Sequence, residues 1–424
     1  MRNIRQKFIA GFTANAFGQL ISIVIQIASL PLFLHWWTVE KYGSWIVLSA
    51  IPVYFSLSDI GFVTTAKNKM QILAAARKNT AAQVTFQSAL LMSVMLSAAL
   101  FTISTIAIYY ADVSVLTNSK NKAALIFLIF GSLIALNSGL IEAVFRVNDK
   151  YAEVTSWLNA IRIIEWVFGM LALVWSGEFI VIALAMSFSR TIATAVLWMA
   201  ARKRFKEYRW SFQLADKAEI RTLFSPSLAF MMFPIGNALS IQGLTLLSSI
   251  FVSPTTIALL TTYRTMSRLV VQVVGVISHT FWPEFSRLFG SKDKNALARL
   301  YSVCNKLTLT ATAITVSLLI LFAEKILLSW THGAIPYERN IFLLFLMAAA
   351  AGSIWHAPRI LLLASNSHTR IAYIFLTVSL VALAICYLIM RVSPMIAIPL
   401  SIIIMEMTML FVSTKIAATL IKTR

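Results

Sequence analysis

Two arginines, Arg264 and Arg268, lie four residues apart in the otherwise uncharged segment TTYRTMSRLVVQVV. In a helix, positions i and i+4 share one face, so both side chains would point in the same direction. A guanidinium group is permanently charged, and its planar fork donates two parallel hydrogen bonds to a carboxylate or a phosphate. The pair could therefore bind an anionic group, if the segment is a helix with access to one.

The composition indicates that the surroundings of these arginines are a membrane. Of the 424 residues, 59% are hydrophobic and only 12% are charged, whereas about 25% are charged in an ordinary soluble domain. Uncharged runs such as Phe8–Val39, Asn79–Ala111 and Ile371–Met390 reach or exceed the roughly 18 to 20 residues that a helix needs to cross about 30 Å of hydrocarbon. Because lipid tolerates no unpaired backbone, the sequence predicts an all-α, polytopic helical membrane protein.

Turn and charge signals divide the apolar sequence into about twelve predicted spans. Their approximate ranges are 11–35, 44–65, 84–110, 123–145, 154–175, 179–200, 222–250, 257–280, 304–323, 340–363, 371–390 and 395–417. The densest basic loop, RKRFKEYRWSFQLADKAEIR, occupies 202–221 at the middle of the chain. We therefore predict two six-helix bundles, 1–201 and 222–424, joined by a basic cytoplasmic linker at 202–221.

The distribution of basic residues predicts the orientation. Lysine and arginine collect in cytoplasmic loops of membrane proteins, and most of the 36 basic residues fall on one side if the N-terminus is cytoplasmic. Both termini are then cytoplasmic. The net charge of +20 reflects this asymmetry and contact with membrane lipids, and no nucleic-acid partner is needed to explain it. The two cysteines and five histidines have no ligand spacing, so we expect no metal and no cofactor.

Four arginines are predicted to lie deep in the membrane. A charge at a helix centre costs about 2.5–3.5 kcal/mol and usually faces a cavity or a partner. At 1.5 Å per residue, Arg268 lies roughly 16 Å below the outer end of its span, near the midplane. Arg190 lies at similar depth in the sixth span, and Arg162 lies about 12 Å from the cytoplasmic side of the fifth. We predict that these three, with Arg264, bind a transported anionic ligand.

Only two acids, Glu165 and Glu406, lie at comparable depth, so the predicted interior is net positive. Together with Asp59, they are the predicted charge partners or ion-coupling groups. Structural alternatives remain open for each. Arg162 and Glu165, three residues apart, could neutralise each other on the helix surface. Glu406 could pair with an arginine of the other half, and Asp59 could cap a helix. A further arginine, Arg359, is expected to extend from a span end to the interface.

Several local patterns resemble the polysaccharide transporter family, which includes Wzx-type O-antigen flippases of the multidrug/oligosaccharidyl-lipid/polysaccharide superfamily. The residues that carry this resemblance are Tyr42-Gly43-Ser44-Trp45, Asp59-Ile60-Gly61-Phe62, Phe145-Arg146, Arg162-Ile163-Ile164-Glu165 and Trp282-Pro283-Glu284-Phe285-Ser286. The resemblance implies two six-helix bundles around a central cavity. It also implies a flippase that moves an undecaprenyl-pyrophosphate-linked oligosaccharide across the bacterial inner membrane during surface polysaccharide assembly, with H⁺ or Na⁺ as a candidate coupling ion.

Other functions compete with this interpretation. An ion-coupled exporter of small drugs would have the same superfamily fold, but a site for cationic drugs would be expected to carry acids at the midplane. A membrane enzyme such as a polysaccharide polymerase would need an acid/base cluster or a large external loop, and neither is present in the sequence. A transporter of small anions would use the arginines equally well. On these grounds we predict a transporter rather than an enzyme, with no catalytic residues.

Overall fold

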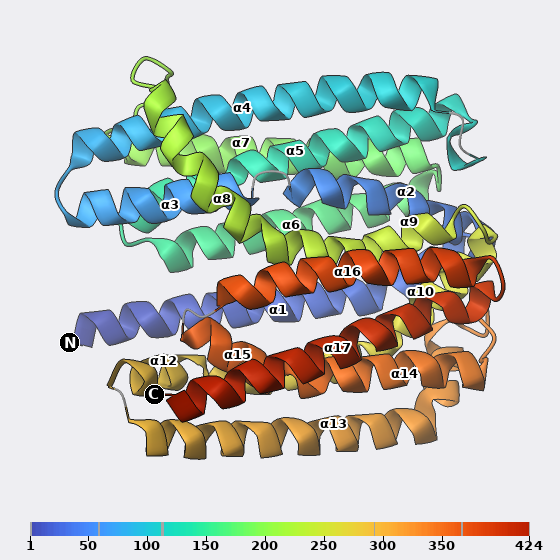
Figure 1. The fold of residues 1–424 in the computed structure, drawn as a ribbon. Coiled ribbons are helices and arrows are strands. Elements are labelled where there is room, and N and C mark those ends of the chain that lie inside the picture. The colour runs from blue at the N-terminus through green and yellow to red at the C-terminus, as the bar shows by residue number, and fades with distance from the viewer. Residues whose placement is uncertain (1, 58–59, 112–113, 292, 366–367, 424) are drawn as a thin grey trace. The chain divides into compact units, whose positions relative to one another are not determined.

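The computed structural model describes residues 2–57, 60–111, 114–291, 293–365 and 368–423, and within these ranges all regular structure is helical (Figure 1). Ten helical segments of the described chain are long and apolar enough to cross a membrane. This confirms the predicted all-α, polytopic class. Asp59, one of the predicted charge partners, lies outside the described residues.

The chain divides into two compact units. The N-terminal unit comprises Met1–Thr38 and Ser44–Pro234, and the C-terminal unit comprises Val39–Gly43 and Ile235–Arg424. The first helices in chain order are α1 (Arg2–Trp36), α2 (Val39–Leu57), α3 (Ile60–Ala75), α4 (Asn79–Tyr110), α5 (Ser119–Val147), α6 (Tyr151–Trp175), α7 (Phe179–Arg204) and α8 (Lys217–Ala238). They are followed by α9 (Leu244–Ser248), α10 (Pro254–Ser267), α11 (Leu269–Thr280), α12 (Trp282–Ser291), α13 (Lys294–Trp330), α14 (Arg339–Ile354), α15 (His356–Ala364), α16 (His368–Met390) and α17 (Pro394–Thr423).

The segment predicted as a linker, 202–221, lies within the N-terminal unit and is bonded to α4. The side-chain amides of Gln83 and Gln87 both donate to the carbonyl oxygen of Arg209, at 2.8 and 3.0 Å. The backbone N–H of Leu214 donates to Oε1 of Gln87 at 2.6 Å. These bonds satisfy the backbone of the segment, so it folds with the unit that precedes it, and the division between the units falls later, at Pro234.

Two predicted spans, 222–250 and 257–280, are interrupted helices. In the first, α8 passes into a π-helical turn, η2 (Leu239–Gly243), and then into the short α9. In the second, α10 and α11 are separated at Arg268. Single π-helical turns inside helices are rare and occur frequently at functional sites. The interruptions therefore point to this part of the C-terminal unit.

Two glycines of the sequence motifs allow close backbone contacts. A Cβ atom at Gly43 in α2 would lie 1.8 Å from the carbonyl oxygen of Pro254, and one at Gly61 in α3 would lie 2.2 Å from the carbonyl oxygen of Ser227. Any residue other than glycine at position 43 or 61 would prevent this close contact, because a real Cβ does not come within 3 Å of backbone. These motif glycines thus serve helix packing.

Candidate functional site

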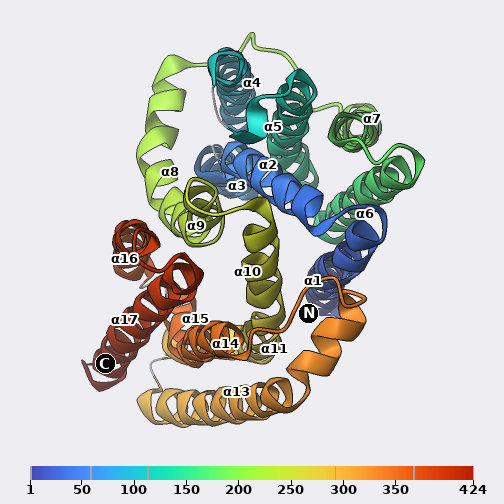
Figure 2. The same ribbon diagram turned by 90° about the vertical axis from the view of Figure 1, so that its right-hand side faces the viewer.

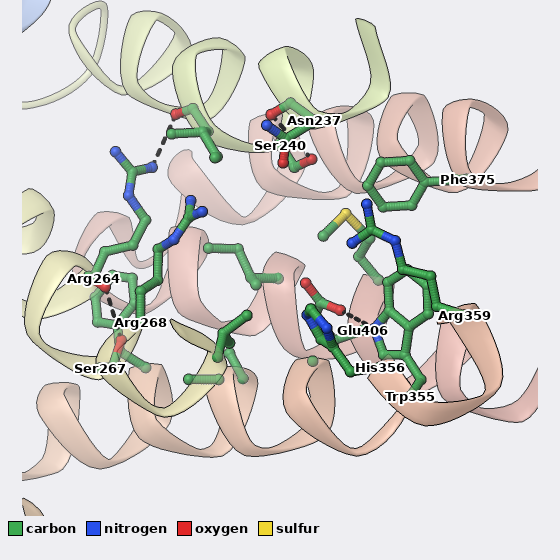
Figure 3. Close-up of a pocket in the computed structure, with 18 residues that line it drawn as sticks. Asn237, Ser240, Arg264, Ser267, Arg268, Trp355, His356, Arg359, Phe375 and Glu406 are labelled. Carbon is green, nitrogen blue, oxygen red and sulfur yellow. Dashed lines mark hydrogen bonds between the residues drawn. The ribbon is translucent and has the colours of Figure 1, made fainter. Parts of the chain in front are cut away.

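A cavity of about 120 Å³ lies in the C-terminal unit, among helices α8, α10, α11, α14, α15, α16 and α17 (Figure 3). Its charged lining residues are Arg264, Arg268, Arg359 and Glu406. The volume has room for several water molecules, each of which needs at least about 10–15 Å³. The lining holds three guanidinium groups and one carboxylate, so the cavity is net positive and suited to an anion.

Three helix interruptions meet at this cavity. The π-helical turn contributes Ser240 and Ile241, and the junction of α10 with α11 contributes Arg268. The junction of α14 with α15 is Trp355. Its cause is Pro358, which has no N–H to donate to the carbonyl four residues earlier. At membrane depth, irregular backbone is tolerated only where protein or a wet cavity surrounds it. This convergence is typical of transporter binding sites.

Arg264 is bound to the π-helical turn. One of its terminal nitrogens donates to the carbonyl oxygen of Ile241 at 2.9 Å, and the other donates to Oγ1 of Thr245 at 2.8 Å. The residue is buried, with 7% of its surface exposed. A π-helical turn disturbs the regular ladder of backbone bonds, and the guanidinium adds a donor at that point. Arg264 therefore stabilises the wall of the cavity.

Arg268 is positioned differently, although it lies one turn further along the same segment. Its guanidinium points into the cavity (Figure 3). Within the described ranges of the chain, that guanidinium makes no hydrogen bond and no ion pair, and its main electrostatic partner is Glu406. The five N–H donors of an arginine are costly to leave unmatched away from water. The group is thus available to a ligand or to cavity water.

Glu406 lies between Arg268 and Arg359 in the cavity wall (Figure 3). The indole N–H of Trp355 donates to its Oε2 at 2.6 Å, and the guanidinium of Arg359 lies 5.4 Å from the ring centroid of the same tryptophan. The carboxyl carbon would be 3.0 Å from a Cβ at Gly352, so the absence of a side chain there makes room for it. One carboxylate is therefore held in place by an indole and is shared by two arginines of its own unit.

No family model and no curated protein sequence matches the chain. Solved structures do match it. An inward-facing multidrug resistance MATE family transporter of the MOP superfamily gives a TM-score of 0.75 at 10% sequence identity, covering 94% of both chains. The chain has the MATE transporter fold.

Two further MATE structures support this result. An outward-facing multidrug resistance MATE family transporter gives a TM-score of 0.60 at 12% identity, covering 94% of this chain and 95% of that one. A mutant of the Vibrio cholerae MATE transporter VcmN gives 0.63 at 13% identity, covering 99% and 97%. The TM-scores and coverages show the fold alone, since the identities are low, and the finer resemblance to polysaccharide flippases rests on the sequence motifs alone.

In the N-terminal unit of this MATE-like fold, the deep charges have direct protein partners. Arg190 on α7 forms an ion pair with Glu165 on α6, with 2.6 Å between Nη1 and Oε2. Arg162 instead donates to Oγ of Ser22 on α1, at 2.6 Å. Of the alternatives left open in the sequence, the pairing of Arg162 with Glu165 along one helix is therefore not the one that the structure has. The two positions are about 60° apart on α6, and the contacts show that Arg162 is turned toward α1 and Glu165 toward α7.

Of the residues that line the cavity, only Arg264, Arg268 and Glu406 were assigned to a site from the sequence, and among those not assigned are Trp355, His356 and Arg359. Arg359 was expected to extend to the interface, because it lies near the predicted end of a span. The available signal was the proline at 358, which interrupts an apolar segment between a tryptophan and an arginine. A broken helix with polar side chains at the break is a stronger indication of a site than depth alone.

Proposed function

We propose that this chain is a membrane transporter that exports a substrate with an anionic group, and that the C-terminal cavity binds that group. The observation that carries the proposal is the Arg268 guanidinium, which has no direct protein partner in the described chain and points into a net-positive cavity. The substrate class that fits the charge is a lipid-linked oligosaccharide diphosphate, because guanidinium forks bind phosphate oxygens bidentately. A cavity of about 120 Å³ suits the diphosphate rather than the sugar.

The same cavity offers a means of ion coupling. A bound diphosphate would draw Arg268 and Arg359 away from Glu406, whose remaining direct contact is the indole of Trp355. An unpaired buried carboxylate is costly, so a proton or Na⁺ would bind it when the substrate arrives. Substrate and coupling ion would then be linked through two arginines and one acid.

A second candidate function is the export of small drug-like molecules. The solved structures favour this alternative, since two of them are described as multidrug resistance transporters. The charge of the cavity favours the first candidate, because three arginines and one glutamate repel a cationic drug. We therefore place anionic substrates first and lipid-linked oligosaccharides first among them.

The test uses bacterial cells whose only copy of this gene carries Arg268→Ala or Arg268→Lys. Surface polysaccharide should be lost in the alanine variant and partly retained in the lysine variant, which keeps the charge without the planar fork. An immunoblot of membranes should show normal protein, because removing a midplane arginine eases insertion. Normal polysaccharide in both variants, with altered accumulation of a fluorescent drug, would favour the second candidate.

The proposed orientation places both termini in the cytoplasm of a bacterial cell, with the chain in the inner membrane. The basic residues of the loops support this proposal. Reporter fusions after Ser176 and Pro254 should then be active on the outer side. A cytoplasmic signal at Pro254 would contradict the crossing of α8 and α9 as one interrupted span.

A further inference from the structure

A second concave surface lies in the N-terminal unit, between α6 and α7, which run side by side (Figure 2). This groove has a volume of about 340 Å³ and no charged residue in its lining. Bulky side chains form its walls, among them Trp157, Phe168 and Phe188, whereas Ala185 and Ala193 leave space between them. The alternation of large and small side chains produces a trough, unlike the convex surface of an ordinary lipid-facing helix.

The groove faces lipid. On the opposite side of α6, Asn159 donates to the carbonyl oxygen of Ala14 at 3.0 Å, so that side is covered by α1. At 100° per residue, positions 157, 161, 164 and 168 lie on the face turned away from α1. Accordingly, 67% of Phe188 and 38% of Trp157 are exposed. The occupant must therefore come from the bilayer.

Basic residues stand at one end of the groove. Lys203 follows Val196 by seven residues, so it lies two turns beyond the lining on the same face of α7. Lys150, the N-cap residue of α6, precedes Trp157 by seven residues at the same end. Both lysines are exposed. Between them, Arg204 and Glu153 form an ion pair at 2.6 Å that joins the ends of α7 and α6. The mouth of the groove is therefore net positive, at the level where lipid phosphates lie.

The groove also has the length of one leaflet. From Trp157 to Phe168 the helix rises about 16 Å at 1.5 Å per residue, which is about half of a hydrocarbon core of roughly 30 Å. An acyl chain of a phospholipid fills such a length, whereas a long polyprenyl tail exceeds it. We propose that this groove binds one acyl chain of an anionic phospholipid, with the headgroup phosphate held by Lys150 and Lys203.

The charges decide the selectivity of this site. An acyl chain gains no hydrophobic free energy when it leaves one apolar surrounding for another, so the groove positions the lipid and the headgroup supplies the preference. Each basic residue near the surface contributes about 1 kcal/mol toward anionic lipid, which is about fivefold in affinity. The inference is independent of the exported substrate, because it concerns a different unit and a different face.

The test uses the full-length protein in vesicles of equal parts phosphatidylethanolamine and phosphatidylglycerol, with a trace of phosphatidylglycerol that carries a photoreactive acyl chain. After illumination, mass spectrometry should find the label in peptides containing 157–168 or 185–196. Lys150→Gln with Lys203→Gln should lower this labelling about twofold, because losing a preference of about fivefold per charge takes the groove from almost all phosphatidylglycerol to the equal mixture of the bilayer. The matched control, Lys294→Gln with Arg299→Gln, removes two exposed basic residues from the start of α13 and should change nothing.

A variant that fills the groove tests the contribution of the acyl chain separately from that of the headgroup. Ala185→Phe should abolish the labelling, whereas Ile163→Phe, on an exposed position outside the lining, should preserve it. Label spread evenly over all lipid-facing helices, or labelling unchanged in the double lysine variant, would overturn the proposal. Displacement of the label by a polyprenyl phosphate but not by unlabelled phosphatidylglycerol would also overturn it, because the occupant would then be a polyprenyl lipid.

Discussion

The arginines of the two units have opposite surroundings. In the N-terminal unit, Arg190 lies against Glu165, and Arg162 donates to Ser22. In the C-terminal unit, Arg268 has no such contact in the described chain and faces a cavity, while its only acidic neighbour, Glu406, is hydrogen-bonded to Trp355. Depth and residue type are alike in the two units. The difference teaches that an intramembrane charge indicates a binding site only when the protein leaves its hydrogen-bonding groups unused.

The largest effect is expected on the free energy of unfolding, which tests the contrast between the two units. Arg190→Met leaves Glu165 unpaired and mostly buried, so the free energy of unfolding should fall by about 3 kcal/mol. Adding Glu165→Leu should restore most of it, because the unpaired charge is then gone. Arg268→Met should cause no such loss. Denaturation of the purified proteins in detergent measures all three, and equal losses for Arg190→Met and Arg268→Met would remove the contrast.

Arg264 should give an intermediate result. Its guanidinium is bonded to the carbonyl oxygen of Ile241 and to Oγ1 of Thr245, so Arg264→Ala removes two buried hydrogen bonds from a charged donor, at about 1.5–3 kcal/mol, although Ile241 keeps its bond from Oγ1 of Thr245. Both stability and transport should therefore fall, in contrast to Arg268→Ala, where transport alone falls. Thr245→Val is the matched control, since it keeps the bond from Arg264 to Ile241 and removes the two bonds that Oγ1 of Thr245 makes, one with Arg264 and one with the carbonyl oxygen of Ile241. Full stability of Arg264→Ala together with loss of transport would make Arg264 a substrate ligand like Arg268.

The smallest effect is expected at Gly352. An added Cβ would lie 3.0 Å from the carboxyl carbon of Glu406, so Gly352→Ala should shift that carboxylate by a few tenths of an ångström. We expect a change in the pH dependence of transport of a few-fold at most, with normal protein levels. Gly275→Ala serves as the control, because its Cβ would meet His356 at an ordinary 3.8 Å. Identical pH profiles of transport for both variants would show that Glu406 takes no part in ion coupling.

The fold class could be predicted from sequence because the length and apolarity of a membrane helix are local properties. The partners of the charges could not. Glu165 lies three residues from Arg162, yet its partner is Arg190, which is 25 residues away. That choice depends on which face of α6 meets α7, and a single sequence does not contain the packing of two helices. The depth of Arg268 was predictable, whereas its lack of a direct partner was not.

Of the helix interruptions, too, one could be predicted from sequence and another could not. Pro358 indicates a break, because proline removes a backbone donor and clashes with the preceding turn. The π-helical turn at Leu239–Gly243 has no comparable signal among its own residues, and one bond to its Ile241 carbonyl comes from Arg264, 21 residues beyond its end. Interruptions caused by one residue can be seen in a sequence, and those stabilised across helices cannot.

The attachment of 202–221 to α4 has a consequence for how this chain can be cut. The segment is rich in lysine and arginine and so offers many sites to trypsin, but the backbone at Arg209 and Leu214 is already bonded to Gln83 and Gln87. A protease needs an extended, unbonded strand, so folded protein should resist cleavage there. A gene split within this segment would likewise separate the N-terminal fragment from part of its own packing.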